Sequence, residues 1–149
     1  MEEILVAIDG SKHSDVIVDH ACDLAKKLPA KILLMHVVKK EGGGSPEEFS
    51  EYARAEHDPD AFARYFQSIG EGIIEKFGAR IRQRGMECET LLETGNPAER
   101  IVEEAAHRKS SAIVVGLRGL HGIDKIRTLG SVSRRVLENA HCTVVVVSV

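Results

Sequence analysis

Two short segments near the C-terminus combine glycine with residues that could bind an anion. The first is Gly116-Leu117-Arg118-Gly119-Leu120-His121-Gly122, and the second is Gly130-Ser131-Val132-Ser133. Glycine has no side chain, so an anion can approach the neighbouring backbone N–H groups closely. If a helix begins at the second segment, its free N–H groups and its dipole add partial positive charge. The two segments therefore favour a phosphate site between them.

Side chains in the same region support this hypothesis without proving it. The cationic residues in or around the intervening loop are Arg118, His121, Lys125 and Arg127. They could neutralise a di- or triphosphate, while Ser131 and Ser133 add hydroxyl donors. The spacing fits neither the P-loop pattern GxxxxGK[ST] nor the dinucleotide fingerprint GxGxxG. On the residues alone, phosphate binding and an ordinary glycine turn between a strand and a helix are equally good explanations.

The elements that position these segments follow from the hydrophobic pattern. Continuous apolar runs predict buried strands, and apolar residues three or four apart predict helices. The predicted strands are Ile4–Ile8, Ile32–Val38, Met86–Leu92, Ala112–Val115 and Thr143–Val147. The helices are predicted from Ser14 to Leu28, from Phe62 to Ile81, from Asn96 onward and from Gly130 onward. This alternation predicts an α/β fold with a five-stranded parallel sheet, doubly wound and covered on both faces.

Two finer expectations concern the helices. Asn96-Pro97-Ala98-Glu99 predicts a helix start in which Asn96 caps, Pro97 takes the first position and Glu99 completes a capping box. The apolar faces that we expect to be buried include Val16, Ile69 and Leu137. The glycine-rich and acidic stretch at about 39–60 predicts a flexible insertion to which we assign no chemistry.

Composition excludes several functional classes. The chain has 149 residues with 20 Lys plus Arg, 23 Asp plus Glu and a net charge of -3, so we expect no nucleic-acid partner. A hydrophobic fraction of 43% predicts one domain over residues 1–149. We expect no membrane span because the longest apolar run is Thr143–Val147, and the absence of a signal-peptide pattern predicts a cytoplasmic protein. The spacing of Cys22, Cys88 and Cys142 predicts buried thiols rather than a disulfide framework or a metal motif.

Over essentially its whole length the sequence resembles the universal stress protein family. The resemblance rests on Ile4–Ser11, which ends in Asp-Gly-Ser, on the predicted strand Leu33–Val38, on Gly95-Asn96-Pro97 and on the two glycine segments. These motifs occur in the order typical of the family. The resemblance implies an adenine-nucleotide alpha-hydrolase-like sheet with the strand order 3-2-1-4-5.

The glycine segments are similar to those of the ATP-binding branch of that family. The branch carries Gly-x-x-Gly, then nine residues, then Gly-Ser or Gly-Thr. Gly116, Gly119, Gly130 and Ser131 match these positions. Ten residues, 120–129, separate Gly119 from Gly130 here, so the loop is one residue longer than the family pattern.

The resemblance implies a nucleotide site at the ends of the first, second and fourth strands. Asp9 would accept a hydrogen bond from adenine or ribose, while Val37 and Val115 would form an apolar slot for the base. Without the resemblance, Asp9 is better explained as a cap of the first helix or as an Asp-Gly turn, and the valines by the core. The implied phosphate-binding residues are Gly116, Gly119, Gly130, Ser131, Val132 and Ser133. Magnesium or manganese would bridge phosphate oxygens, and we assign no metal ligand to the protein.

Three functions are compatible with these residues. The first is an ATP-binding stress-response or signalling module with little or slow hydrolysis, and the alternatives are a nucleotide-independent scaffold and a weak ATP hydrolase. No histidine is paired with a serine or cysteine in a recognisable nucleophile motif, which favours binding over catalysis. The family also implies a homodimer, formed through the β-branched segment Thr143–Val147, whose edge position would expose unpaired backbone groups.

Overall fold

The computed structural model describes residues 1–39, 60–117 and 129–148. Its strands are β1 (Glu2–Ile8), β2 (Ala30–Val38), β3 (Cys88–Thr94), β4 (Ala112–Gly116) and β5 (Thr143–Val147). Its helices are α1 (Ser14–Lys27), α3 (Ala61–Gln83), α4 (Pro97–Arg108) and α5 (Ser131–Asn139). The strands form one sheet in the order β3-β2-β1-β4-β5, and every neighbouring pair is parallel. The predicted fold class and strand order are therefore confirmed.

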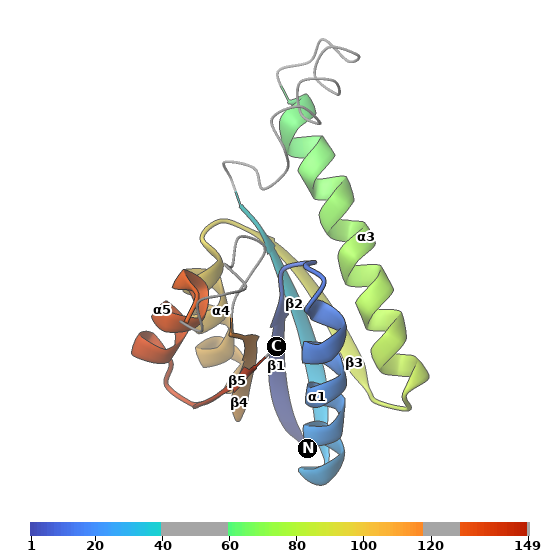
Figure 1. Ribbon diagram of the computed structural model, residues 1–149, viewed down its shortest axis with the longest axis vertical. Coiled ribbons are helices and arrows are strands. Elements are labelled where there is room, and N and C mark those ends of the chain that lie inside the picture. Colours follow the sequence, from blue (N-terminus) through green and yellow to red (C-terminus); the bar gives the residue numbers. More distant parts are fainter. Residues whose placement is uncertain (40–59, 118–128, 149) are drawn as a thin grey trace.

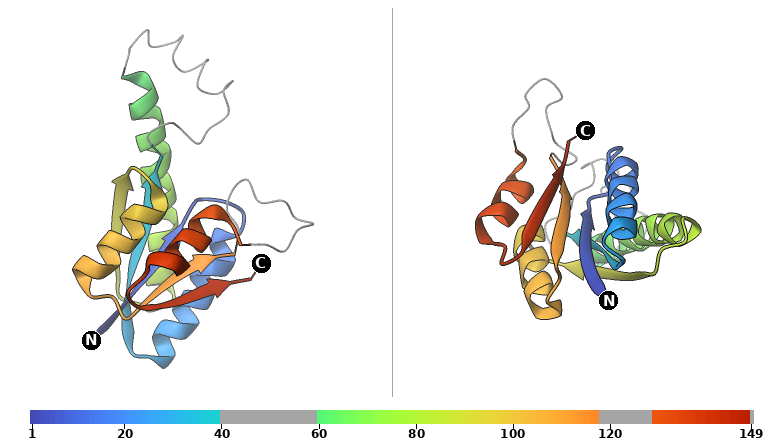
Figure 2. Two further views of the ribbon diagram at one scale, coloured as in Figure 1. Left: turned by 90° about the vertical axis from the view of Figure 1, so that its left-hand side faces the viewer. Right: turned by 90° about the horizontal axis from the view of Figure 1, so that it is seen from below.

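The helices form two layers, one on each face of the sheet. Helices α1 and α3 lie on one side and α4 and α5 on the other (Figures 1 and 2). Side chains of a strand point alternately to the two faces, so β1 contributes Ile4 and Val6 to the first layer and Leu5 to the second. All three are completely buried. Strands buried on both faces explain why the sequence shows continuous apolar runs rather than an alternating pattern.

The structure corrects two details of the predicted elements. The third strand is Cys88–Thr94 rather than Met86–Leu92, because Gly85 adopts a positive φ of 79° and Met86 still bonds to the carbonyl of Ile81 in the preceding helix. Three residues that we expected in the core are exposed instead: Val16 by 40%, Ile69 by 40% and Leu137 by 42%. The apolar stripes are wider than the surface that the sheet covers, so residues at their borders face solvent.

The start of α4 confirms the predicted cap in part. Asn96 accepts a hydrogen bond from the N–H of Glu99 at 3.2 Å, and Pro97 is the first helical residue. The Glu99 carboxylate lies 3.7 Å from Arg135 of α5. Among the described contacts the second half of the capping box, from Glu99 back to Asn96, is not formed. The side chain of Glu99 links two helices of the same layer instead.

Helices α1 and α3 are joined by arginine–carboxylate pairs. Arg80 donates to both carboxylate oxygens of Asp19, at 3.0 Å and 2.8 Å. Arg84 donates to Asp19 at 3.1 Å and to Asp23 at 2.8 Å. A bidentate arginine contact fixes the relative orientation of two elements better than a single bond does. These pairs therefore set how α3 lies against α1.

The hydrogen bonds from Arg80 lower the pKa of Asp19 below its usual 3.8. A depressed carboxyl pKa stabilises the fold above the unfolded pKa, and this stability is lost as pH falls through the folded pKa. We expect Asp19→Asn to lower the free energy of unfolding by up to about 1 kcal/mol near neutral pH, since the pair is partly exposed. Urea unfolding should show that the difference from the unmodified protein shrinks below about pH 4.

Asp23→Asn is the matched control for this prediction. Asp23 is 60% exposed and bonds to Arg84 alone, so its replacement should change stability less than the replacement of Asp19. A loss in Asp19→Asn that stayed constant down to about pH 3 would show that the carboxylate charge does not stabilise the helix pair.

Candidate functional site

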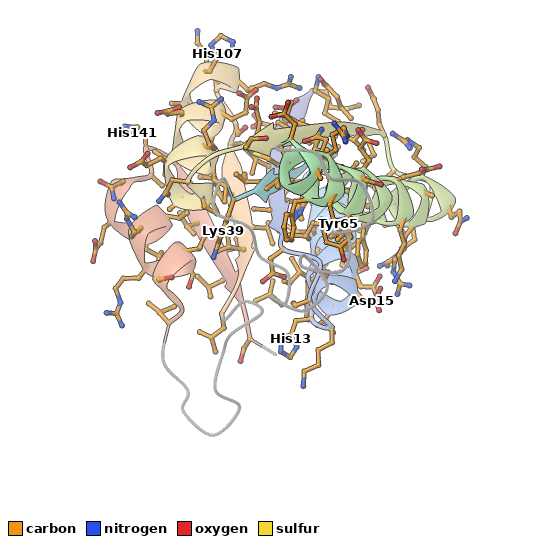
Figure 3. All side chains as sticks on the ribbon, turned by 90° about the horizontal axis from the view of Figure 1, so that it is seen from above. His13, Asp15, Lys39, Tyr65, His107 and His141 are labelled. Atoms are coloured by element: carbon orange, nitrogen blue, oxygen red, sulfur yellow. The ribbon has the colours of Figure 1, made fainter. Side chains whose placement is uncertain are left out.

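The carboxyl ends of the strands lie at one edge of the sheet, where the direction of winding changes. Strand β1 lies between β2 and β4. The helix that follows β1 covers one face, and the helix that follows β4 covers the other (Figure 1). The chain leaves β1 and β4 in opposite directions, and ligands of such sheets generally bind outside the carboxyl ends of strands at this switch point. Figure 3 looks onto this edge of the sheet.

The three predicted base-binding residues lie at or just after the ends of β1, β2 and β4. Ile8 pairs with His36, so Asp9 lies beside Val37 if the register continues by one residue. Val37 and Val115 belong to the same hydrophobic cluster, on the face covered by α4 and α5. They are 8% and 3% exposed, whereas Asp9 is half-buried. The arrangement places an apolar wall and a carboxylate on the same face at the edge of the sheet.

Asp9 takes part in the turn that follows β1. Its Oδ1 atom accepts the N–H of Ser11 at 2.9 Å, which is an Asx turn. The turn interpretation is therefore confirmed, and it leaves the second carboxylate oxygen for another partner. Gly10 is needed here because its φ is 79° and a Cβ atom would lie 2.5 Å from Cδ1 of Ile73. The turn holds the Asp9 carboxylate in a defined place.

The two glycine segments meet where β4 ends and α5 begins. Gly116 is the last residue of β4, and Gly130 is the N-cap of α5. The N–H of Gly130 donates to the carbonyl of Leu117 at 2.8 Å, so the two ends of the intervening chain are joined. The first turn of α5 contains no acidic residue, so none of its side chains offsets the positive end of the helix dipole. The remaining residues predicted for this region lie outside the described part of the chain, namely Arg118, Gly119, His121, Lys125 and Arg127.

The two serines of α5 are not equivalent. Ser131 is exposed, and Val132 is half-buried. Ser133 is only 3% exposed, and its Oγ lies 3.1 Å from the carbonyls of both Leu117 and Gly130. A hydroxyl has a single proton, and here that proton is directed at backbone carbonyls. Ser131 can offer a hydroxyl to a ligand, whereas Ser133 can offer its backbone N–H.

Lys39 is a residue of this edge that the sequence interpretation missed. It follows β2 directly and is exposed. Figure 3 shows it at the end of the sheet where the strands finish. The signal was its position directly after the predicted strand Ile32–Val38. In the structure Lys39 lines a groove together with Val38 and Thr94.

The described residues carry little that could catalyse a reaction. Burial raises the pKa of the thiols of Cys22, Cys88 and Cys142, which disfavours the nucleophilic thiolate, and all three cysteines are free. Cys22 is fully buried, but Cys88 and Cys142 are only partly so. Nδ1 of His36 lies 2.8 Å from the carbonyl of Ile8, as in a satisfied core histidine. Within residues 1–39, 60–117 and 129–148, no three His, Cys, Asp or Glu side chains are grouped as a metal site would need.

A groove of about 550 Å³ lies on the other side of β2. Its walls include Val38, Thr94, Phe66 and Glu71, so it opens between β2, β3 and α3. Lys39 also lines this groove, which therefore lies next to the carboxyl end of β2. None of the helices that the structure describes is long and apolar enough to cross a membrane.

Comparison with known proteins now identifies the family. The model of the universal stress protein family matches residues 1–148. The chain belongs to this family. It is 32% identical to the universal stress protein YxiE of Bacillus subtilis, over 97% of each chain. It is also 32% identical to the universal stress protein MJ0531 of Methanocaldococcus jannaschii, over 98% of this chain and 81% of that one.

Solved structures of low sequence identity share the fold of this universal stress protein. The hypothetical protein MJ0577 superimposes with a TM-score of 0.80 at 20% identity, covering 99% of this chain and 96% of that chain. A universal stress protein crystallised with cAMP gives a TM-score of 0.70 at 24% identity, with 99% and 96% covered. Further similar structures hold dAMP, from Archaeoglobus fulgidus, and AMP, from Arabidopsis thaliana.

The turn after Asp9 can be tested by adding one methyl group. We expect Gly10→Ala to lower the free energy of unfolding by about 1–2 kcal/mol, because a positive φ is costly for any residue with a Cβ atom. Gly72→Ala is the matched control, since Gly72 lies in α3 with no atom within 4 Å of the added Cβ. That change should stabilise the helix by up to about 1 kcal/mol. Denaturant titrations measure both, and equal effects would contradict the strained turn.

Proposed function

We propose that this universal stress protein binds ATP with magnesium at the edge of the sheet where β1, β2 and β4 end. In this proposal it acts as a stress-response or signalling module that hydrolyses ATP slowly or not at all. The observation that carries the proposal is the meeting of two features at one edge. An apolar wall with a carboxylate, formed by Asp9, Val37 and Val115, lies on the same face of the sheet as α5. The helix N-terminus there can attract an anion.

Each part of the nucleotide has a proposed partner. Adenine would lie against Val37 and Val115, and the free oxygen of Asp9 would accept a hydrogen bond from the amine or the ribose. The phosphates would accept hydrogen bonds from the backbone N–H groups around Gly116 and from those of residues 130–133. The Ser131 hydroxyl would be a further donor. The remaining proposed phosphate partners are Gly119, Arg118, His121 and Arg127, outside the described residues.

In this proposal the metal ion is held mainly by the nucleotide. Magnesium prefers oxygen ligands and is commonly held by nucleotide phosphates with few protein carboxylates. The bound metal would offset phosphate charge, which leaves the protein to orient the nucleotide.

Related structures and the charge at the proposed site both support the binding of an adenine nucleotide. Three structures with this fold were solved with cAMP, dAMP or AMP, all of which contain adenine and a phosphate. The N-terminus of α5 supplies partial positive charge in a chain whose net charge is -3. Selective placement of positive charge at one edge favours a small anionic ligand over a polyanion. A cytoplasmic location remains a prediction from the sequence.

We also propose a homodimer formed through β5. This strand lies at the edge of the sheet, next to β4 alone. The carbonyl of Val147 accepts the N–H of Leu117, so Val147 turns its backbone groups toward β4. Backbone groups alternate along a strand, so those of Val145 also face β4, while those of Val144 and Val146 face outward. A second copy could pair with this outward row and remove the exposed edge.

Nucleotide binding can be tested by isothermal titration with ATP and magnesium. We expect Gly130→Val to weaken binding at least about tenfold, because a branched side chain would fill the phosphate site. Gly130 has a φ of -65°, which valine adopts easily, so the variant should fold. Gly130→Ala is the matched control and should bind better than the valine variant. A folded wild-type protein that binds no ATP would instead favour the nucleotide-independent scaffold.

Phosphate release from the same samples separates binding from catalysis. We expect turnover well below about 1 s⁻¹, the low end of ordinary enzymes. A rate at or above that value would overturn the binding-module proposal and favour the ATP hydrolase.

The dimer proposal predicts different results for two changes at Val144. Val144→Pro removes an outward N–H and should give a monomer, whereas Val144→Ala keeps that N–H and should leave the dimer intact. Val145→Pro would be a poorer test, since it also removes an N–H that faces β4. Sedimentation velocity measures the oligomeric state, and an unchanged sedimentation coefficient for Val144→Pro would argue against pairing through β5.

A further inference from the structure

The peptide groups of Leu117 connect three elements at the candidate site. Its N–H donates to the carbonyl of Val147 in β5 at 2.9 Å. Its carbonyl accepts the N–H of Gly130, the N-cap of α5, at 2.8 Å. The same carbonyl lies 3.1 Å from Oγ of Ser133. Leu117 itself follows the last residue of β4, so β4, α5 and β5 are linked at this residue.

Ser133 is buried in a way that suits anchoring rather than ligand contact. Its side chain lies inside the first turn of α5 and is 3% exposed. Oγ is shared between the carbonyls of Leu117 and Gly130, each at 3.1 Å. The two donors at the Leu117 carbonyl match its two lone pairs. Removing the hydroxyl would leave the Leu117 carbonyl with one partner fewer in a partly buried place.

We propose that Ser133 is a positioning residue whose hydroxyl fixes the N-terminus of α5 against the end of β4, and that it is not a phosphate ligand through its side chain. The inference rests on the proposed nucleotide function. Anion binding by a helix start requires N–H groups that already point to one place. The Ser133 hydroxyl and the Gly130 N–H both hold the Leu117 carbonyl, so together they set where the N–H groups of Ser131 and Val132 point.

Damage confined to the phosphate subsite and general damage to the fold differ in which ligands they affect. Titrations of Ser133→Ala should use ATP with magnesium and, in parallel, adenosine, which lacks phosphates. We expect the affinity for ATP to fall roughly 3- to 10-fold, as the loss of one hydrogen bond predicts, and the affinity for adenosine to stay unchanged. Ser133→Thr retains the hydroxyl and should restore ATP affinity. Equal losses for both ligands would indicate general damage to the fold and overturn the inference.

Amide hydrogen exchange without nucleotide supplies the readout that identifies positioning. In Ser133→Ala the N–H of Gly130 should exchange roughly 3- to 10-fold faster, because its acceptor is held less firmly. Ser131→Ala should weaken ATP binding without changing this exchange rate. Loss of ATP affinity in Ser133→Ala with unchanged exchange at Gly130 would make Ser133 a direct ligand, and faster exchange with unchanged ATP affinity would show that the anchor does not position the site.

Ser111→Ala is the matched control for a lost serine–carbonyl bond. The Ser111 hydroxyl donates to the carbonyl of Glu3 at 3.0 Å, at the opposite edge of the sheet. Its removal should affect neither ATP affinity nor exchange at Gly130. If the wild-type protein binds neither ATP nor adenosine, the proposed nucleotide function fails. The exchange rate of Gly130 then decides separately whether Ser133 anchors the turn.

Discussion

Strand β1 pairs with β2 on one side and with β4 on the other, and the two hydrophobic cores of the protein meet on it. Its residues Ile4, Leu5 and Val6 have no exposed surface and point in turn to opposite layers. A polar side chain at any of these three positions would be buried and would cost free energy unless it found a hydrogen-bond partner. The arrangement also forces the following helices onto opposite faces, because parallel neighbours require right-handed crossovers. The topological switch point at the carboxyl ends of β1 and β4 is a consequence of this central strand.

The two ends of the sheet are stabilised by different interactions. At the amino end, Arg108 makes bidentate contacts with Glu3 of β1 and with Glu89 of β3. The hydrogen bonds from Arg108 lower the pKa of Glu89. At the carboxyl end, the turns are held by hydrogen bonds that involve the backbone, such as those at Asp9 and Leu117. At the amino end the charged side chains pair with one another. At the carboxyl end, backbone N–H groups and a carboxylate oxygen remain available for a ligand.

The candidate site draws on groups that face outward and on groups that hold the structure around them. Partial positive charge comes from the N-terminus of α5, and the apolar wall comes from Val37 and Val115, which are also part of the core. The contrast between the exposed Ser131 and the buried Ser133 illustrates this division. One hydroxyl faces outward, while the other holds the backbone that surrounds it.

The sequence by itself determined the alternation of strands and helices, because continuous apolar runs and helical periodicity are local consequences of burial. It also located Asp9, Gly116 and Gly130 at the ends of elements, since Asp, Asn and Gly mark turns and caps for conformational reasons. The partners of individual groups depended on tertiary structure. Oγ of Ser133 meets a carbonyl sixteen residues away, and the exposure of Ile69 depends on where the sheet stops covering α3. Such outcomes follow from how distant segments pack, which no local pattern of residue types records.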